Sequence, residues 1–167
     1  LLHLSRIEGG NLNMTIEKIN LDHIVESTIL NLEQEALKKS IKIESLVDKR
    51  IEVLSDFISL DIIISNYLNN ALAYSPNNSK ILITAEEVDK KIKLSVKDEG
   101  EGIPENYKDR VFERFFRVDK GRSLNQGGTG LGLSIVKNLA STLSCPVGVE
   151  NLEPKGASFW IELNKST

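Results

Sequence analysis

Hydrophobic residues recur at helical spacing in four segments of the chain. These segments run over Leu1–Glu8, Asp22–Lys39, about Asp56 to Tyr74, and from near Gly130 to Ser144. The first stops at Gly9-Gly10, a natural helix end, and Asp22 is a plausible N-cap for the second. The pattern therefore predicts a short leading helix followed by three helices of a globular domain.

Alternation of apolar and polar residues predicts strands between these helices. The expected strands are Met14–Ile19, Ile41–Val47, Ile51–Leu54, Lys80–Val88, Lys91–Lys97, Val147–Asn151 and Ala157–Leu163. Charged residues 48–50 join the second strand to the third. Asp89-Lys90 has the signature of a hairpin turn, and residues 154–156 separate the closing strands. Strands in groups with three helices between them predict an α+β fold, in which the helices pack on one face of a mixed sheet.

Composition narrows the class of protein without naming it. The 167 residues are 40% hydrophobic and 27% charged, which is typical of one soluble globular domain. A formal charge of −3 gives no reason to expect nucleic acid as a partner. The lone Cys145 excludes an internal disulfide and is expected to be inert. The sequence contains no long apolar span or signal peptide, and because it begins with Leu1 we expect a fragment of a longer protein.

A glycine-rich run, Gly127-Gly128-Thr129-Gly130-Leu131-Gly132, precedes the last predicted helix. Glycine lets the backbone approach a ligand closely, and a helix start offers unpaired N–H groups, so the run is typical of a polyphosphate site. The spacing excludes a Walker A loop, which needs Gly-Lys-Ser/Thr, and a Rossmann fingerprint, which needs glycine where Leu133 stands. The run therefore indicates a nucleotide but not a fold.

Asn66 and Asn70 are four residues apart on the 56–74 helix and so share one face. Amide oxygens can bind Mg²⁺, and asparagine is an unfavourable helix residue. Taken alone, the pair fits a solvated helix edge at least as well.

Asp98 follows a predicted strand and precedes Gly100, Gly102 and Ile103. A carboxylate at a strand end can accept a hydrogen bond from an exocyclic amine such as that of adenine. An Asx turn that merely ends the strand explains the same residues equally well.

Three phenylalanines and several cations fill the stretch before the glycine run. We expect Phe112 and Phe115 to anchor a loop in the core. Arg117, Lys120 and Arg122 could neutralise phosphate, or could form a solvated basic stretch.

Taken in order, these four segments resemble the ATP-binding catalytic domain of sensor histidine kinases, in the superfamily that also holds DNA gyrase and MutL-type ATPases. Residues 66–71 match the N box, 98–103 the G1 box, 112–117 the F box and 128–132 the G2 box. The resemblance covers essentially the whole chain. It implies a two-layer Bergerat-type ATP-binding fold with a mostly antiparallel sheet, and makes residues 1–10 the end of a dimerisation-domain helix with its linker and 11–167 the catalytic domain.

The resemblance also implies roles for individual residues. Asn70 would be the principal Mg²⁺ ligand, with Asn66 beside it near the phosphates of ATP. Asp98 would bind the adenine amine beside Gly100, Gly102 and Ile103, and Tyr74 would pack against the base. Arg117 and Lys120 would face phosphate. The remaining expected contacts come from the ATP lid that ends in Gly128, Thr129, Gly130, Leu131 and Gly132.

Two departures from the family pattern matter. Ala73 occupies a position where the family often has a phosphate-binding cation, for which Lys120, Arg122 and Lys80 are candidate replacements. The phosphoacceptor histidine box is also missing, since His3 and His23 have the wrong positions and are interpreted as structural or surface residues.

The expected activity is therefore phosphoryl transfer to a histidine outside these residues. The implied partners are a histidine-bearing dimerisation domain of the same protein, which forms the homodimer, and a response regulator. The domain would be cytoplasmic, with family habit favouring a membrane-anchored parent protein. Gyrase-type ATPases carry a glutamate general base where this chain has Asn66, which favours a kinase over an ATPase. A degenerate ATP sensor or interaction module stays open because of Ala73.

Overall fold

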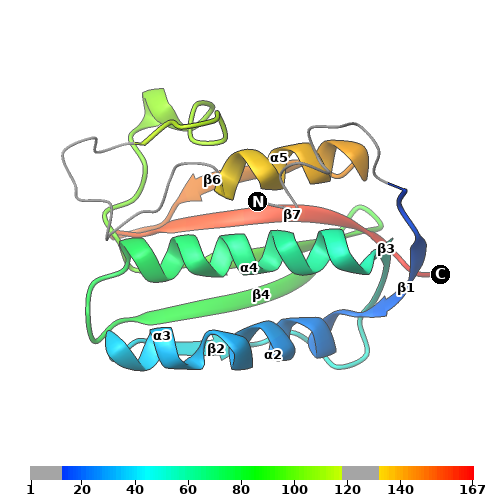
Figure 1. Cartoon of the computed structure of the whole chain (residues 1–167), viewed down its shortest axis with the longest axis horizontal. Coiled ribbons are helices and arrows are strands. Elements are labelled where there is room, and N and C mark those ends of the chain that lie inside the picture. The colour runs from blue at the N-terminus through cyan, green and yellow to red at the C-terminus, as the bar shows by residue number, and fades with distance from the viewer. Residues whose placement is uncertain (1–12, 118–131) are drawn as a thin grey trace.

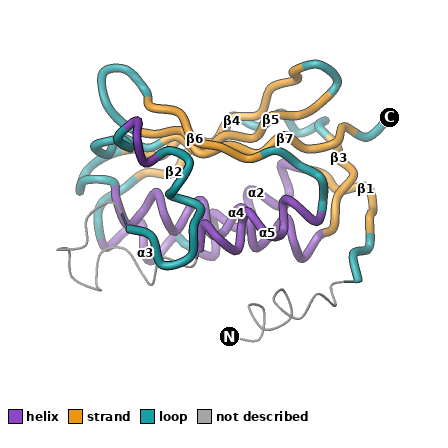
Figure 2. Tube along the Cα trace, turned by 90° about the horizontal axis from the view of Figure 1, so that it is seen from above, coloured by secondary structure: helices purple, strands orange, loops and turns teal. Residues whose placement is uncertain are grey.

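The chain forms two layers, a mixed sheet and a set of helices packed on one of its faces (Figures 1 and 2). The computed structural model describes residues 13–117 and 132–167. The strands are β1 (Ile16–Asn20), β2 (Lys42–Ser45), β3 (Glu52–Asp56), β4 (Lys80–Val88), β5 (Lys91–Lys97), β6 (Val147–Asn151) and β7 (Ala157–Lys165). The helices are α2 (Leu21–Asn31), α3 (Glu33–Lys38), α4 (Phe57–Tyr74), the short 3₁₀ turn η1 (Glu105–Tyr107) and α5 (Gly132–Thr142). This confirms the α+β fold with helices on one face.

Strand order in the described sheet is β1-β3-β7-β5-β4-β2, with β6 added on β7. All pairs are antiparallel except β2 with β4. The two strands joined by residues 48–50 therefore lie far apart, with β2 at one edge and β3 next to the other. The expected hairpin between β4 and β5 is confirmed, because Val88 pairs with Lys91 and both turn residues have positive φ, the geometry of a tight primed turn.

Two details of the helix predicted over Asp22–Lys39 were wrong. Its N-cap is Asn20 rather than Asp22, since the Asn20 side chain accepts a hydrogen bond from the His23 amide. Asp22 lies inside the first turn, where its charge favours the positive end of the helix dipole. The helix is also interrupted at Leu32, which separates α2 from α3.

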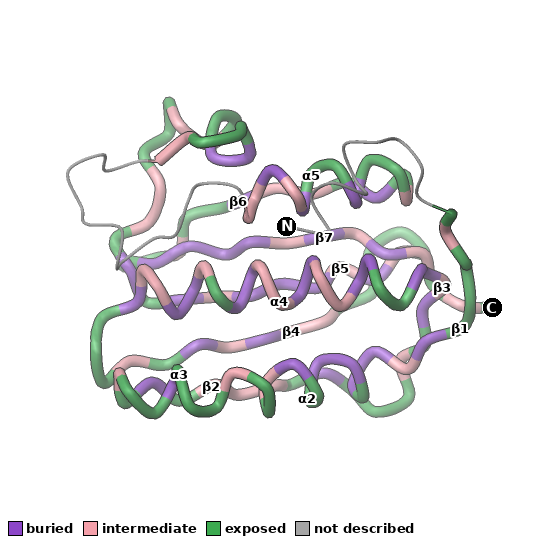
Figure 3. Tube along the Cα trace, viewed as in Figure 1, coloured by how far each residue is buried: buried purple, intermediate pink, exposed green. Residues whose placement is uncertain are grey.

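The core lies between α4 and the middle strands (Figure 3). Leu60, Ile63, Ile64 and Leu68 of α4 are fully buried, as are Ile81, Leu94 and Ile161 on the facing strands. Tyr67 is also buried, and its hydroxyl donates to the Trp160 carbonyl at 2.8 Å. These contacts fix the rotation of α4 about its axis, and so decide which of its residues face away from the sheet. No helix among the described residues is long and apolar enough to cross a membrane.

Candidate nucleotide site

One face of α4 carries Asn66, Asn70 and Tyr74, which we call the α4 stripe. The three are partly exposed and four residues apart, so they lie one above another along the helix. From Asn66 to Tyr74 the helix rises about 12 Å. The stripe is therefore an elongated polar surface along a helix whose other side is buried.

The start of α5 contacts the Asn66 end of the stripe. Gly132 is the first residue of α5, and a Cβ at this position would lie 2.9 Å from Asn66 Oδ1. Asn66 Nδ2 donates to the Ile62 carbonyl at 2.9 Å, which directs the amide oxygen away from its own helix. The structure thus brings together Asn66 and the last glycine of the run, and Figure 1 shows the two helices side by side. Lys120 and residues 128–131 lie outside the described residues.

The loop that follows β5 contacts the Tyr74 end of the stripe. A Cβ at Gly100 would lie 2.8 Å from the Tyr74 carbonyl oxygen, so the loop passes directly against the end of α4. The substitution of any larger residue at Gly100 would force these two backbones apart.

Asp98 is buried at the base of this loop. Its Oδ1 accepts hydrogen bonds from the amides of Gly100 at 2.9 Å and Ala157 at 3.1 Å, which confirms the Asx turn. The described residues give no partner to Oδ2, so the turn uses only one of the two oxygens. Burial raises the pKa of the carboxyl, and the two amide hydrogen bonds partly oppose that shift. The turn and the ligand interpretations are therefore compatible.

Asn151, the last residue of β6, holds the other end of the loop. Its Nδ2 donates to the Ile103 carbonyl at 2.7 Å, and its Oδ1 accepts from the Ile103 amide at 2.8 Å. Gly102 has a φ of +83°, and a Cβ there would lie 2.8 Å from Asn151 Oδ1. Sequence reasoning missed this residue, because nothing local distinguishes it from a surface asparagine.

Gly156 is a second residue that sequence reasoning assigned only to a turn. Its φ is +106°, and a Cβ at this position would clash with the Asp98 carbonyl oxygen. The Asp98 amide also donates to the Ala157 carbonyl at 2.9 Å. The turn between β6 and β7 therefore packs directly against the Asp98 backbone and fixes its position.

The aromatic segment differs in one respect from the expected anchor. Phe112 is buried with its ring 6.2 Å from that of Phe159, as expected. Phe115 is 63% exposed and has a φ of +62°, so its assignment to the core was wrong. The left-handed backbone at Phe115 turns its side chain outward, and Phe116 packs instead, with its ring 5.3 Å from that of Tyr107.

Arg117 is half-buried, and its Nε has no hydrogen-bond partner among the described residues. A buried guanidinium nitrogen without a partner is unfavourable unless a ligand or another group satisfies it. Arg117 therefore keeps hydrogen-bonding capacity that an anion could use.

Two lysines outside the four motifs already have protein partners. Lys39 Nζ donates to the carbonyls of Leu72 at 2.6 Å and Ser75 at 2.8 Å, and so caps the C-terminus of α4. Burial lowers the Lys39 pKa. Lys80 Nζ lies 3.5 Å from the Glu44 carboxylate on β2, which engages this candidate cation at the sheet edge.

The donor set fits Mg²⁺ bound together with a nucleotide rather than a metal held by the protein alone. No group of three or more His, Cys, Asp or Glu residues that could hold a metal ion occurs in the part of the chain that the structure describes. The amide oxygens of the Asn pair are hard ligands, and Mg²⁺ completes its shell with water and phosphate oxygens. Asn66 Oδ1 and the Asn70 side chain, which has no hydrogen-bond partner among the described residues, are therefore suitable ligands.

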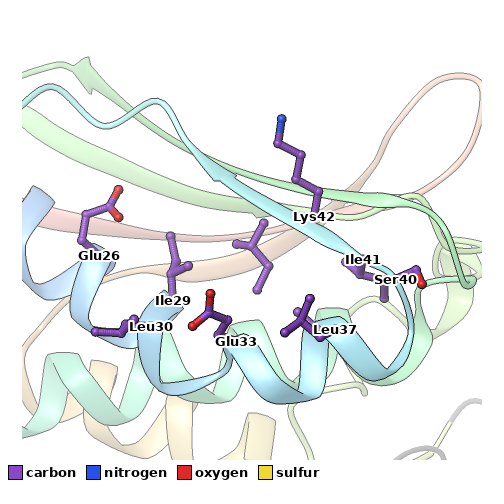
Figure 4. Close-up of a pocket in the computed structure, with 10 residues that line it drawn as sticks. Glu26, Ile29, Leu30, Glu33, Leu37, Ser40, Ile41 and Lys42 are labelled. Atoms are coloured by element: carbon purple, nitrogen blue, oxygen red, sulfur yellow. The ribbon is translucent and has the colours of Figure 1, made fainter.

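A separate groove of about 500 Å³ lies between α2–α3 and β2 (Figure 4). Ile29, Leu30 and Leu37 line it with Glu26 and Glu33. It contains no residue of the α4 stripe or of the 98–103 loop, so it is distinct from the candidate nucleotide site.

These features together are those of a two-layer nucleotide-binding domain with a helix-borne amide pair. A family model described as histidine kinase-, DNA gyrase B- and HSP90-like ATPase matches residues 55–167. The chain therefore belongs to this ATPase family, and the resemblance drawn from the four boxes is confirmed.

Its relatives include sensor histidine kinases. The chain is 35% identical over 163 residues to the sensor-like histidine kinase SenX3 of Mycolicibacterium smegmatis, covering 98% of this chain and 42% of that protein. The chain thus spans less than half the length of this relative.

Solved structures show the same fold. Full-length ShkA in complex with AMPPNP has a TM-score of 0.85 at 27% identity, covering 99% of this chain and 34% of ShkA. The catalytic domain of histidine kinase ThkA has a TM-score of 0.80 at 28% identity, covering 91% of this chain and 97% of that domain. The neighbouring structures also include ThkA in complex with the response regulator protein TrrA, with a TM-score of 0.79 at 24% identity, covering 99% of this chain and 47% of that one.

Proposed function

We propose that this chain is the ATP-binding kinase domain of a two-component sensor histidine kinase, which transfers the γ-phosphoryl group of ATP to a histidine on a separate domain. The observation that carries the proposal is the placement of the α4 stripe between two glycine contacts. Gly132 meets Asn66 at one end, and Gly100 meets the Tyr74 backbone beside Asp98 at the other. An elongated ligand fits this arrangement with its base at the Asp98 end and its polyphosphate at the Asn66 end.

The adenine end would be formed by Asp98, Gly100, Gly102 and Ile103. Asp98 Oδ2 would accept a hydrogen bond from the exocyclic amine, because Oδ1 is already engaged by two amides. Tyr74 would contribute its ring to the same end.

The phosphate end would be formed by the Asn pair, Arg117 and the start of α5. Asn70 would bind Mg²⁺ with Asn66 beside it. The metal, when bound, neutralises charge on the phosphates of ATP. Arg117 would donate to a phosphate oxygen, which is supported by the lack of a partner for its Nε among the described residues. Lys120 and residues 128–131 are proposed to complete this end on the strength of the G2 resemblance.

In the proposed reaction, the neutral imidazole of the acceptor histidine attacks the γ-phosphorus through a ring nitrogen. A P–N bond forms as the bond between the γ-phosphorus and the bridging oxygen breaks, and ADP leaves with the electron pair. Hydrolysis would instead need a general base to activate water, and Asn66 cannot accept a proton. Catalysis would rest on positioning and charge stabilisation.

We further propose that residues 1–10 link this catalytic domain, 11–167, to a dimerisation domain that bears the acceptor histidine and forms a homodimer. A response regulator would then receive the phosphoryl group, as the complex of ThkA with TrrA illustrates for that protein. The proposed site of action is the cytoplasm, where ATP is available, whether or not the parent protein is anchored in a membrane. His23 is exposed on α2 and is not proposed as an acceptor.

The test mixes this chain with Mg-ATP and a separate histidine-bearing dimerisation domain. Acid-labile phosphate should appear on the dimerisation domain, and should be lost when its histidine is replaced by glutamine. Rapid release of phosphate without any histidine substrate would favour the ATPase alternative. Failure to bind Mg-ATP at all would favour a degenerate interaction module.

A further inference from the structure

The side chain of Asn151 forms the same pair of hydrogen bonds to a backbone that a residue of a neighbouring antiparallel strand would form. Its amide both donates to and accepts from the backbone of a single residue, Ile103, at 2.7 and 2.8 Å. The two residues are 48 positions apart, so the contact is entirely tertiary. Because Asn151 is otherwise exposed, its side chain would be free to rotate in solvent without this pair of bonds. Asparagine is well suited here, since it offers a donor and an acceptor side by side.

The surrounding backbone is shaped to receive this amide. Gly102 has a φ of +83°, and a Cβ there would lie 2.8 Å from Asn151 Oδ1. The Leu152 amide donates to the Gly156 carbonyl at 2.9 Å, which closes the turn after β6. Gly156 then faces the Asp98 carbonyl, as described above. The loop after β5 is thus fixed at its beginning by Gly156 and at its end by Asn151.

We propose that Asn151 is a positioning residue for adenine recognition, which holds the 98–103 loop so that the Asp98 carboxylate and the loop backbone keep their binding geometry. This inference rests on the proposed function, in which Asp98 contacts the base. The loop after β5 and the turn after β6 lie at the same end of the sheet, because Lys97 pairs with Ser158 (Figure 1). Among the described residues the Asn151 side chain hydrogen-bonds to Ile103 and lies against Gly102, so its effect on a nucleotide would pass through these two loop residues.

The energetic reason is that a loop must be ordered before it can bind. Each ordered residue loses conformational entropy, and a loop held in its bound shape avoids that loss on binding. Loss of the two hydrogen bonds is expected to weaken ATP binding about tenfold, since each contributes modestly and both act on the same loop.

The experiment compares Asn151→Ala with the unmodified chain in titrations of Mg-ATP and Mg-GTP. We expect ATP affinity to fall about tenfold and the preference for ATP over GTP to shrink, because the base-reading carboxylate is no longer held in register. Amide exchange at Ile103 should accelerate, since its hydrogen-bond acceptor is gone. Glu150→Ala is the matched control, as it lies on the same strand and loses only an exposed ion pair with Lys93.

A second variant covers the case in which Asn151→Ala folds poorly. Asn151→Asp keeps the shape and the acceptor for the Ile103 amide but loses the donor to the Ile103 carbonyl. It should also reduce ATP affinity and the ATP preference.

The outcomes separate this inference from the proposed function. If the unmodified chain binds Mg-ATP and both Asn151 variants bind it equally well, the positioning role is overturned while the kinase proposal stands. An equal loss of ATP and GTP affinity would also overturn the positioning role, because it would indicate general loosening of the domain. If the unmodified chain does not bind Mg-ATP, both proposals fall.

Discussion

The fold holds the two ends of the α4 stripe in very different ways. At the Tyr74 end, Asp98 is fixed by two amides, by the Gly156 contact and through the Asn151 contact with Ile103. At the Asn66 end, Asn66 Oδ1 faces Gly132. Arg117, which we propose to act at this end, has no hydrogen-bond partner for its Nε among the described residues.

This difference teaches how the proposed site divides its work. Recognition of a flat base needs fixed geometry. The hydrogen bonds at the Tyr74 end hold the loop in that geometry before a ligand binds. Binding of a phosphate group that must move during the reaction needs charged and polar groups whose hydrogen bonds are not already used by other protein groups. The following predictions break one end at a time.

The largest effect is expected at the phosphate end. Asn70→Ala should reduce phosphotransfer to the acceptor histidine on the order of a hundredfold or more, because a ligand to the metal is lost. Transfer of labelled phosphate measures this directly. Asn69→Ala is a close control, since Asn69 is the neighbouring residue on the same helix and is exposed. Equal activity of the two variants would remove Asn70 from the site.

At the adenine end, Asp98→Asn should weaken ATP binding about tenfold, which corresponds to loss of a hydrogen bond to a charged group. The new amide hydrogen would face the donor amine of adenine, whereas the carbonyl of guanine could accept it. ATP affinity should therefore fall relative to GTP affinity in competition titrations. An equal fall for both nucleotides would contradict an adenine contact.

The same carboxyl makes a pH prediction of opposite sign for binding and stability. Because burial raises the Asp98 pKa, the native state takes up a proton at a higher pH than the unfolded chain does. As the pH falls through this raised pKa, protonation of Asp98 should increase the stability of the domain without nucleotide. The same protonation removes the carboxylate and should weaken ATP binding. Titrations across acidic pH should show a dependence in the unmodified chain that Asp98→Asn lacks.

A smaller effect is expected from Lys39→Met, which removes the cap of α4. The carbonyls of Leu72 and Ser75 would lose their shared donor, so the free energy of unfolding should fall by about 1–2 kcal/mol. Denaturant unfolding provides the measurement. Lys38→Met serves as control, because the Lys38 side chain is 75% exposed and, in the part of the chain that the structure describes, pairs only with Glu35 at the surface. If the two variants are equally stable, the cap contributes little.

The smallest effect is expected from Lys80→Ala. Its pair with Glu44 is exposed, so the unfolding free energy should change by less than about 1 kcal/mol. ATP affinity should be unchanged if Lys80 does not replace the family's usual cation at Ala73. A clear loss of affinity would return Lys80 to the phosphate end and narrow the contrast between the two ends.

Local chemistry made much of the fold predictable. The β4–β5 hairpin follows from two turn residues between alternating strands, and α4 follows from its period and from Asp56, whose side chain caps the helix through the Ser59 amide. The N-cap of α2 was misplaced because Asn20 and Asp22 are both good caps, and only the start of the helix decides between them. The parallel pairing of β2 with β4 is non-local, so adjacent periodicities could not reveal it.

The candidate site also divides into local features, which the sequence predicts, and non-local contacts, which it does not. The four boxes are contiguous in sequence, and their residues could be named from the family resemblance. Asn151 and Gly156 act through contacts with residues far away in the chain. Phe115 was misplaced because its left-handed backbone turns the side chain outward, and a phenylalanine in the sequence gives no sign of a positive φ. What the sequence could not provide was the support behind the expected ligand contacts.

The α4 stripe also limits how this domain can vary in length. One residue inserted between Asn66 and Asn70 would rotate everything on one side of it by about 100° around the helix, which would turn one amide toward the sheet. Four inserted residues would restore the facing but separate the two ends by about 6 Å more. Insertions in surface loops carry no such penalty, so among lineages that keep the activity we expect length variation in the loops and a constant spacing along α4.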